Sequence, residues 1–187
     1  GKKNGYGIYL QTNGNKYVGG FKDGLKSGQG TLTYGKGKFE GDLYVGEFKD
    51  GKKNGHGIYN QTDGSKYVGE FKNGLKNGQG TITYGIGRFE GDKYDGEFKN
   101  NKKNGEGIYT SPNGDKYSGE FRNGLKNGQG TITYGIGKFE GDKYEGEFKD
   151  DRKHGHGKYN YVNGDIYSGK FKKDKIHGLG IFRWNNG

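Results

Sequence analysis

Apolar and glycine residues alternate with polar residues in short segments along the chain. Residues 44–48 (YVGEF) and residues 55–59 (GHGIY) each repeat a side-chain type at every second position, which is the period of a β-strand. Residues 49–54 between them are polar and contain Gly51, as is typical of a turn. Residues 60–66 hold a second turn signal. The pattern therefore predicts a β-hairpin followed by a link to the next hairpin.

This unit recurs along the chain at two alternating intervals. Seven tyrosines begin near-copies of it, and the steps between them alternate between 27 and 23 residues: Tyr17, Tyr44, Tyr67, Tyr94, Tyr117, Tyr144 and Tyr167. The units are residues 17–43, 44–66, 67–93, 94–116, 117–143, 144–166 and 167–187, preceded by a partial repeat at 1–16. A fixed short period is the signature of a repeat architecture. We therefore expect one continuous array: an all-β, single-layer solenoid of stacked antiparallel β-hairpins, elongated and twisted.

Every second unit carries four additional residues before the next tyrosine. The additional segment contains Tyr34 and Phe39 in the first long unit, and equivalent tyrosines and phenylalanines in the next two. We interpret it as a longer link, or as lengthened strands, that projects on one side of the sheet. The true structural period is then about fifty residues.

The repeated glycines predict how the aromatic rings pack. Glycine weakens the interior of a strand, so 43 glycines at recurring positions must serve packing. A glycine surface allows an aromatic ring to lie flat against the backbone. The rings are expected to be divided between the core and a groove for a partner protein, and the candidates are Tyr17, Phe21, Tyr44, Phe48, Tyr67, Phe71, Tyr94, Phe98, Tyr117, Phe121, Tyr144 and Phe148.

Composition favours a thin fold. Only 26% of the residues are hydrophobic and 29% are charged, a balance that points toward disorder, but aromatic residues reach 15% and stand at fixed positions. The absence of cysteine excludes disulfides and fits a reducing compartment. No apolar run approaches the roughly twenty residues that span a bilayer. Because Gly1 falls within a repeat, we expect the chain to be a segment of a longer protein.

The net charge of +10 suggests acidic partners. One lysine falls at each hairpin turn, and these lysines are expected to form a basic row along one edge of the sheet, a candidate contact for an anionic surface: Lys26, Lys53, Lys76, Lys103, Lys126 and Lys153. At roughly 10 Å between successive hairpins, their fields overlap in physiological salt. The alternative interpretation is that these lysines only protect the edge of the sheet from aggregation.

Residues suited to catalysis or cofactor binding are not arranged as a site. The glycine-rich stretch at 35–41 (GKGKFEG) has neither the spacing nor the following helix of a phosphate loop. His154 and His177 occupy equivalent positions in adjacent hairpins, roughly 10 Å apart, too far to share a zinc ion. Recurring glutamates such as Glu47 indicate a solvated face. We expect no enzyme activity, no cofactor and no metal.

The repeated motif Y-x-G-x-F-x-x-G-x-x-x-G-x-G resembles the MORN repeat (membrane occupation and recognition nexus). It stands as YVGEFKDGKKNGHG at residues 44–57 and YSGEFRNGLKNGQG at residues 117–130, and the resemblance covers essentially the whole chain. Every second unit of this chain is four residues longer than the common MORN pattern. The resemblance implies a cytoplasmic protein at the cytoskeleton, the cilium or the membrane periphery.

The leading hypothesis is a non-catalytic scaffold that binds partner proteins through its aromatic face. The first alternative is a membrane-targeting module that binds anionic phosphoinositides. The second is a regulatory repeat region of a larger enzyme, since MORN repeats are attached to lipid kinase and methyltransferase domains. Nucleic acid ranks last as a partner, because acidic and basic ladders interleave. Exposed sheet edges at the ends of the array predict homodimers or end-to-end association.

Overall fold

The structure, a computed structural model, describes residues 1–186. Within this range the chain forms fifteen β-strands and no helix, so no segment of it is a membrane-spanning helix. The strands are β1 (Gly5–Leu10), β2 (Lys16–Lys22), β3 (Leu25–Thr33), β4 (Leu43–Lys49), β5 (Lys52–Asn60), β6 (Lys66–Lys72), β7 (Leu75–Thr83), β8 (Lys93–Lys99), β9 (Lys102–Thr110), β10 (Lys116–Arg122), β11 (Leu125–Thr133), β12 (Lys143–Lys149), β13 (Arg152–Asn160), β14 (Ile166–Lys172) and β15 (Lys175–Arg183).

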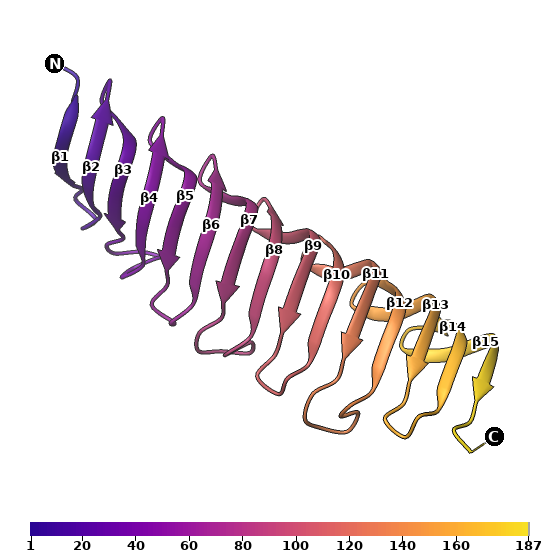
Figure 1. Cartoon of the computed structure of the whole chain (residues 1–187). Helices are drawn as coiled ribbons and strands as arrows, with labels where there is room; N and C mark the ends of the chain where they lie inside the picture. Colours follow the sequence, from indigo (N-terminus) through magenta and orange to yellow (C-terminus); the bar gives the residue numbers. More distant parts are fainter. Residues whose placement is uncertain (187) are drawn as a thin grey trace. The chain divides into compact units, whose positions relative to one another are not determined.

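The chain divides into two compact units. The first holds Gly1–Gly91 and Phe98–Asn101, and the second holds Asp92–Glu97 and the residues from Lys102 onward, so that β8 contributes to both. In the first unit β1 to β7 pair antiparallel in the order of the chain, and in the second unit β9 to β15 do the same (Figure 1). The predicted all-β fold of stacked antiparallel hairpins is therefore confirmed. That these hairpins make one continuous array stays a prediction.

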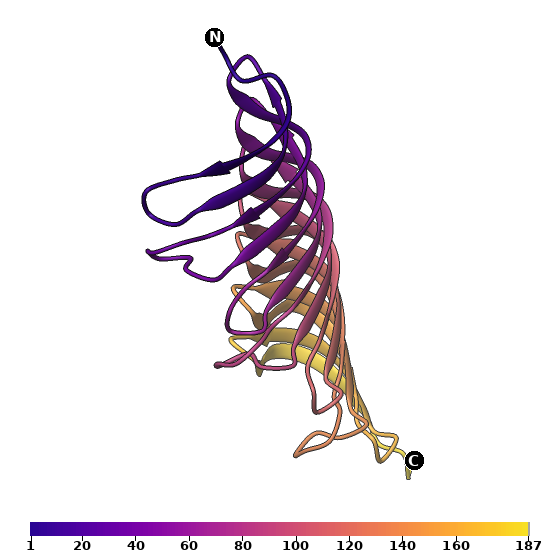
Figure 2. The ribbon, with the colours of Figure 1, turned by 90° about the vertical axis from the view of Figure 1, so that its left-hand side faces the viewer.

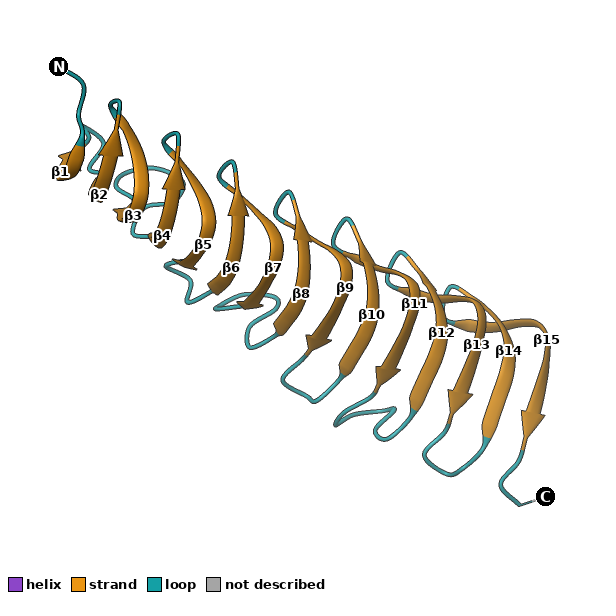
Figure 3. Ribbon diagram, turned by 45° about the horizontal axis from the view of Figure 1, so that its top comes forward, coloured by secondary structure: helices purple, strands orange, loops and turns teal. Residues whose placement is uncertain are grey.

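Each unit is a single layer of strands. Figure 2 shows the strands of each unit side by side, with no second layer against them. Tight hairpin turns lie along one side of each unit and the longer links along the other (Figure 3). Successive side chains of a strand point to opposite faces of the sheet, so every second residue of a strand lies on the same face.

Two-residue turns close the hairpins and connect neighbouring ones. Asp50 and Gly51 both have positive φ (50° and 77°), the geometry of the type I′ turn that Asp-Gly favours. The N–H of Gly51 donates to the carbonyl of Lys26 in the preceding hairpin at 3.0 Å. Where the second turn residue is Asn101, its side-chain oxygen also accepts the N–H of Lys76 at 2.9 Å. Asp151 and Asp174 act in the same way on Lys126 and Lys153. The turns thus bind each hairpin to its neighbour.

A β-bulge gives the recurring glutamates a structural role. Gly46 pairs with Gly57 but Phe48 pairs with Lys53, so Glu47 lies opposite residues 54–56, and the two additional residues belong to β5. The Glu47 carboxylate folds over Gly55 and accepts the N–H of His56 at 2.9 Å. Glu70, Glu120 and Glu147 accept the corresponding amides at 2.7–2.8 Å. The recurring glutamates, which the sequence predicted to form a solvated face, therefore also bind the backbone amides at the bulges.

The links are fastened by a polar residue two positions before each tyrosine. The Asn15 oxygen accepts the N–H of Gly35 at 2.7 Å, and Asp115 accepts that of Gly135 at 2.8 Å. The same bond, always to a residue twenty positions later, joins Asp42 to Thr62, Ser65 to Gly85, Asp142 to Val162 and Asp165 to Asn185. The residue twenty positions after Asp92 is Pro112, which has no N–H to donate.

The core consists of tyrosine rings lying on glycine. The ring of Tyr44 is fully buried and covers Gly46 and Gly57, and its hydroxyl donates to the carbonyl of Glu47 at 2.9 Å. It meets Phe48 and Phe71 edge-on, with ring centroids 5.1 Å from each. The equivalent tyrosines Tyr17, Tyr67, Tyr94, Tyr117 and Tyr144 are 0–1% exposed. Such edge-to-face pairs each contribute about 0.5–1.5 kcal/mol beyond area burial.

We predict that Gly57→Ala destabilises the chain by about 1–3 kcal/mol, the usual range for overpacking. A Cβ at this position would lie 2.4–2.6 Å from Oη, Cε2 and Cζ of Tyr44. Gly7 is the matched control, because it occupies the equivalent position in β1 and its Cβ would meet only Phe21 at 3.8 Å. Urea denaturation should show Gly7→Ala to be neutral or slightly stabilising. Equal effects of the two substitutions would refute the tyrosine-on-glycine core.

Candidate partner-binding face

The aromatic face is the side of each unit that carries the tyrosine, glycine and phenylalanine ladders. All twelve rings predicted to line a partner groove lie in these ladders. Eleven are buried and Phe21 is half-buried. Their contact with a partner stays a prediction, but their burial makes them the floor of the face. Surface for a partner must come from residues above that floor.

The long links supply exposed aromatic surface. These links are residues 34–42, 84–92 and 134–142. In the first, the Tyr34 ring packs edge-on against Phe39 and Tyr59, with centroids 5.8 Å and 6.0 Å away. Phe39 itself is 47% exposed, and the equivalent Phe89 and Phe139 are 48% and 47% exposed. Each long link therefore places one accessible phenylalanine beside the aromatic face.

A buried carboxylate holds each long link in position. Asp42 is buried and accepts hydrogen bonds from the Tyr59 hydroxyl and from the N–H of Thr62 at 3.1 Å. Asp142 makes the same bonds to Tyr159 at 2.6 Å and to Val162 at 2.8 Å. Burial, together with the hydrogen bond to Asp42, raises the pKa of Tyr59, so its hydroxyl stays a donor at neutral pH. Sequence reasoning missed this carboxylate, although an Asp before the tyrosine of every unit that follows a long link was a usable signal.

The predicted row lysines lie over the aromatic face. Each is the second residue of its strand and the second residue after the turn pair, and so lies beyond the turn at which the sequence placed it: Lys26, Lys53, Lys76, Lys103, Lys126 and Lys153. Lys53 Nζ lies 4.2 Å from the ring centroid of Tyr59 and within 5.3–5.8 Å of those of Tyr34, Tyr44 and Phe71. Cation–π attraction of this kind contributes about 0.5–2 kcal/mol. The row lysines thus cover the side of the aromatic rings that faces away from the strands.

Two lysine environments alternate with the period of fifty. Lys53, Lys103 and Lys153 each have a second tyrosine at 4.2–4.6 Å. In the hairpins of Lys26, Lys76 and Lys126, each of which has a tyrosine centroid at 4.8–5.2 Å, an aliphatic residue takes the place of the second tyrosine: Leu32, Ile82 or Ile132. The second tyrosine is therefore found in those hairpins that follow a long link.

The row lysines are half-buried cations without an ionic partner. None of them forms an ion pair within residues 1–186, where Lys143–Glu145 and His156–Glu147 do. Burial lowers the pKa of Lys53, Lys76 and Lys103 to about 8, from an ordinary value of 10.5. It lowers the pKa of the other three as well. Aspartates attract five of these lysines without forming an ion pair, so a carboxylate placed directly over the row would add an ionic contact that the chain itself does not make.

A hollow of about 490 Å³ opens on the aromatic face of the first unit. Tyr34, Phe39 and Tyr59 line it together with Lys53 and Lys76. Its size lies within the range of about 300–1,000 Å³ that is usual for ligand sites. The hollow thus combines accessible rings with the unpaired cations of the row.

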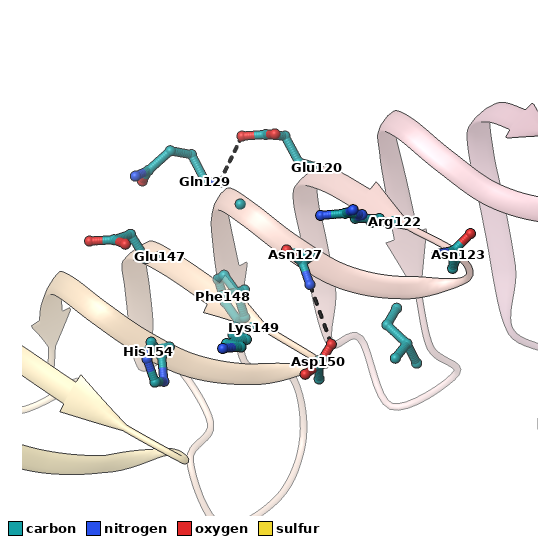
Figure 4. A pocket seen from close by; sticks show the side chains of 12 residues that line it. Glu120, Arg122, Asn123, Asn127, Gln129, Glu147, Phe148, Lys149, Asp150 and His154 are labelled. Atoms are coloured by element: carbon teal, nitrogen blue, oxygen red, sulfur yellow. Dashed lines mark hydrogen bonds between the residues drawn. The ribbon is translucent and has the colours of Figure 1, made fainter.

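A second hollow, of about 670 Å³, lies in the second unit on the opposite face (Figure 4). Glu120, Arg122 and Glu147 line it, and the Asn127 amide there donates to Asp150 at 3.4 Å. Its charges are mixed and largely paired with neighbouring polar groups. Within residues 1–186, no group of three or more His, Cys, Asp or Glu side chains is arranged to hold a metal ion.

The sequence pattern of the MORN repeat family matches eight segments of the chain. They are residues 1–16, 17–39, 44–66, 67–87, 94–116, 117–139, 144–166 and 167–187. The chain belongs to the MORN repeat family. In each long unit the match ends inside the long link, at residue 39, 87 or 139, so the rest of that link is additional to the family pattern.

Two solved structures are similar to this MORN repeat chain at low identity. One is the SAS-4 (dCPAP) TCP domain of Drosophila melanogaster in complex with a proline-rich motif of Ana2 (dSTIL), with 14% identity, a TM-score of 0.49, and 97% of this chain and 85% of the other covered. The other is the TCP10 domain of Danio rerio CPAP in complex with a STIL peptide, with 14% identity, a TM-score of 0.27, and 88% and 83% covered. No curated protein matches the chain.

We predict that Tyr59→Phe lowers the free energy of unfolding by about 1–3 kcal/mol. The substitution removes a hydrogen bond from the buried Asp42 carboxylate, and such a group is costly to leave unsatisfied. Tyr9→Phe is the matched control, because Tyr9 holds the equivalent place in β1 and its hydroxyl is not bonded to a carboxylate within residues 1–186. Thermal or urea unfolding should separate the two variants. Similar losses of stability in the two variants would show that the hydrogen bond between Tyr59 and Asp42 does not stabilise the fold.

We predict that stability rises with pH above about 8. Lys53, Lys76 and Lys103 lose their protons near pH 8 in the folded chain but near 10.5 when unfolded, so between these values the unfolded chain binds more protons. The cost of burying the ammonium groups is thus present below pH 8 and relieved as pH rises. The rise should reverse above pH 10.0, where tyrosines of the unfolded chain ionise. In the folded chain burial raises the pKa of Tyr134 to about 12, so above pH 10.0 the unfolded chain loses protons first and stability falls.

The urea midpoint measured across this pH range tests the point. The triple variant Lys53→Met, Lys76→Met, Lys103→Met should show a clearly smaller rise. A midpoint in the unaltered chain that falls between pH 8 and 10 would contradict the buried-cation description.

Proposed function

We propose that this MORN repeat chain is a non-catalytic scaffold that binds segments of partner proteins along its aromatic face. The observation that supports this most directly is the hollow beside Lys53. There an exposed Phe39 and a half-buried Tyr34 stand next to Lys53 and Lys76, neither of which has an ionic partner. Aromatic rings beside unsatisfied cations are suited to a peptide that carries both apolar and acidic groups.

Repetition of the surface favours a scaffold over an enzyme. Phe89 and Phe139 repeat the exposed ring of Phe39 at intervals of fifty residues, and Lys103 and Lys153 repeat the environment of Lys53. An enzyme places groups of different character at one site, whereas these positions are near-copies. We therefore favour several equivalent contacts along a partner, with modest strength at each and avidity between them.

A membrane-binding function is the second candidate, and the tips of the long links favour it. Ile86 is 77% exposed and stands beside Arg88 and Phe89, a combination of apolar and basic residues suited to an anionic interface. We rank it second because the row lysines are half-buried among rings. A regulatory role within a larger enzyme is a third candidate. In each case we propose a cytoplasmic location at the cytoskeleton, the cilium or the membrane periphery.

Selection of peptides from a displayed library tests the scaffold proposal. We expect selected peptides to lose at least about tenfold in affinity, roughly 1.4 kcal/mol, for the variant Phe39→Ser, Phe89→Ser, Phe139→Ser. The control variant carries Val45→Ser, Val68→Ser and Ile108→Ser, which are 40–44% exposed on the opposite face. It should retain binding. Peptides sensitive to the control but not to the phenylalanine variant would overturn the proposal.

A further inference from the structure

The row lysines recur at a fixed distance within each unit. The first unit holds Lys26, Lys53 and Lys76, and the second holds Lys103, Lys126 and Lys153. Each step crosses two strands, and neighbouring strands lie about 4.8 Å apart, so successive lysines are about 9.6 Å apart. A partner that meets all three lysines of a unit must present complementary groups at that interval.

The interval selects the conformation of the partner. A polyproline II helix has three residues per turn and rises about 3.1 Å per residue, so every third side chain returns to one side after about 9.3 Å. A β-strand turns every third side chain to the opposite side. An α-helix returns a side chain after seven residues and about 10.5 Å, and so drifts by about 1 Å per hairpin. Polyproline II, which drifts by about 0.3 Å, fits best.

Charge and surface chemistry select its side chains. Because no row lysine forms an ion pair within residues 1–186, a carboxylate over each lysine would add a direct ionic contact. Between the lysines the partner meets aromatic rings such as Tyr34, Phe39 and Tyr59. Aromatic-lined grooves recognise proline-rich segments, whose rigid backbone loses little entropy on binding.

We propose that the aromatic face binds an acidic polyproline II segment of a partner protein, with Glu or Asp at every third position and proline between. Each carboxylate lies over one row lysine, and the intervening prolines contact the rings of the long links. The inference rests on the scaffold function proposed above and adds the charge, spacing and conformation of the bound segment. It also predicts that binding weakens as salt rises, because ionic contacts at an accessible face are screened.

Fluorescence anisotropy with three labelled peptides of equal length tests the inference. The first repeats Glu-Pro-Pro, the second contains the same residues with its glutamates adjacent, and the third repeats Gln-Pro-Pro. We expect the first to bind at least about tenfold more tightly than the other two. The double variant Lys76→Gln, Lys126→Gln, which changes one lysine in each unit, should weaken it by about three- to tenfold, as expected for loss of one charged contact at each row. The control Lys72→Gln, at an exposed lysine at the end of β6, should not. Circular dichroism checks that both variants fold.

Each other outcome overturns a distinct claim. Equal binding of the three peptides, lost in the Phe39, Phe89 and Phe139 variant, would remove the acidic spacing and leave the scaffold function standing. Failure of Glu-Pro-Pro to bind, while library peptides still depend on those phenylalanines, would do the same. Binding of phosphoinositide vesicles that is lost in the variant Lys76→Gln, Lys126→Gln, with no binding of Glu-Pro-Pro, would show instead that the row binds membranes. Library peptides that ignore the phenylalanines would instead remove the scaffold function.

Discussion

The contact of a tyrosine ring with a glycine backbone is what gives this single-layer sheet a buried core. A single layer of strands has no second sheet to cover its side chains, yet six tyrosines are at most 1% exposed. They are buried because each ring lies on glycines of its own and the next strand, where a Cβ would be closer than 3 Å. Only 26% of the residues are hydrophobic. Close contact between ring and backbone, more than apolar area, therefore stabilises the fold.

This contact also determines what the surface can be. Glycine has no side chain that could reach over the tyrosine ring. In the hairpin of Tyr44, the side chain that lies over the ring is that of Lys53. Its ammonium is drawn over the rings, loses solvent and has its pKa lowered to about 8. The row of unpaired cations is thus a consequence of the core. Any partner that approaches the aromatic face meets these cations before it meets the rings.

Sequence patterns predicted the elements well because each depends on local spacing. Alternation around Gly46 predicted the strands, and Gly51 predicted the turn. The division of rings between core and surface could not be predicted, since it depends on how neighbouring hairpins stack. The two additional residues of β5 opposite Glu47 cannot be recognised until the register is known. The buried Asp42 was missed for the same reason, because its partners lie seventeen and twenty residues away.

The residues that fold the chain and those that would distinguish its partners are largely separate. Tyrosine and glycine ladders are shared by short and long units, so they carry no information about position. The long links do, because Phe39 is exposed while Asp42, in the same link, is buried and bonded to Tyr59 and Thr62. A change at Phe39 therefore alters the face without touching the core. Since the MORN pattern ends inside these links, the period of fifty is where this chain can acquire a specificity of its own.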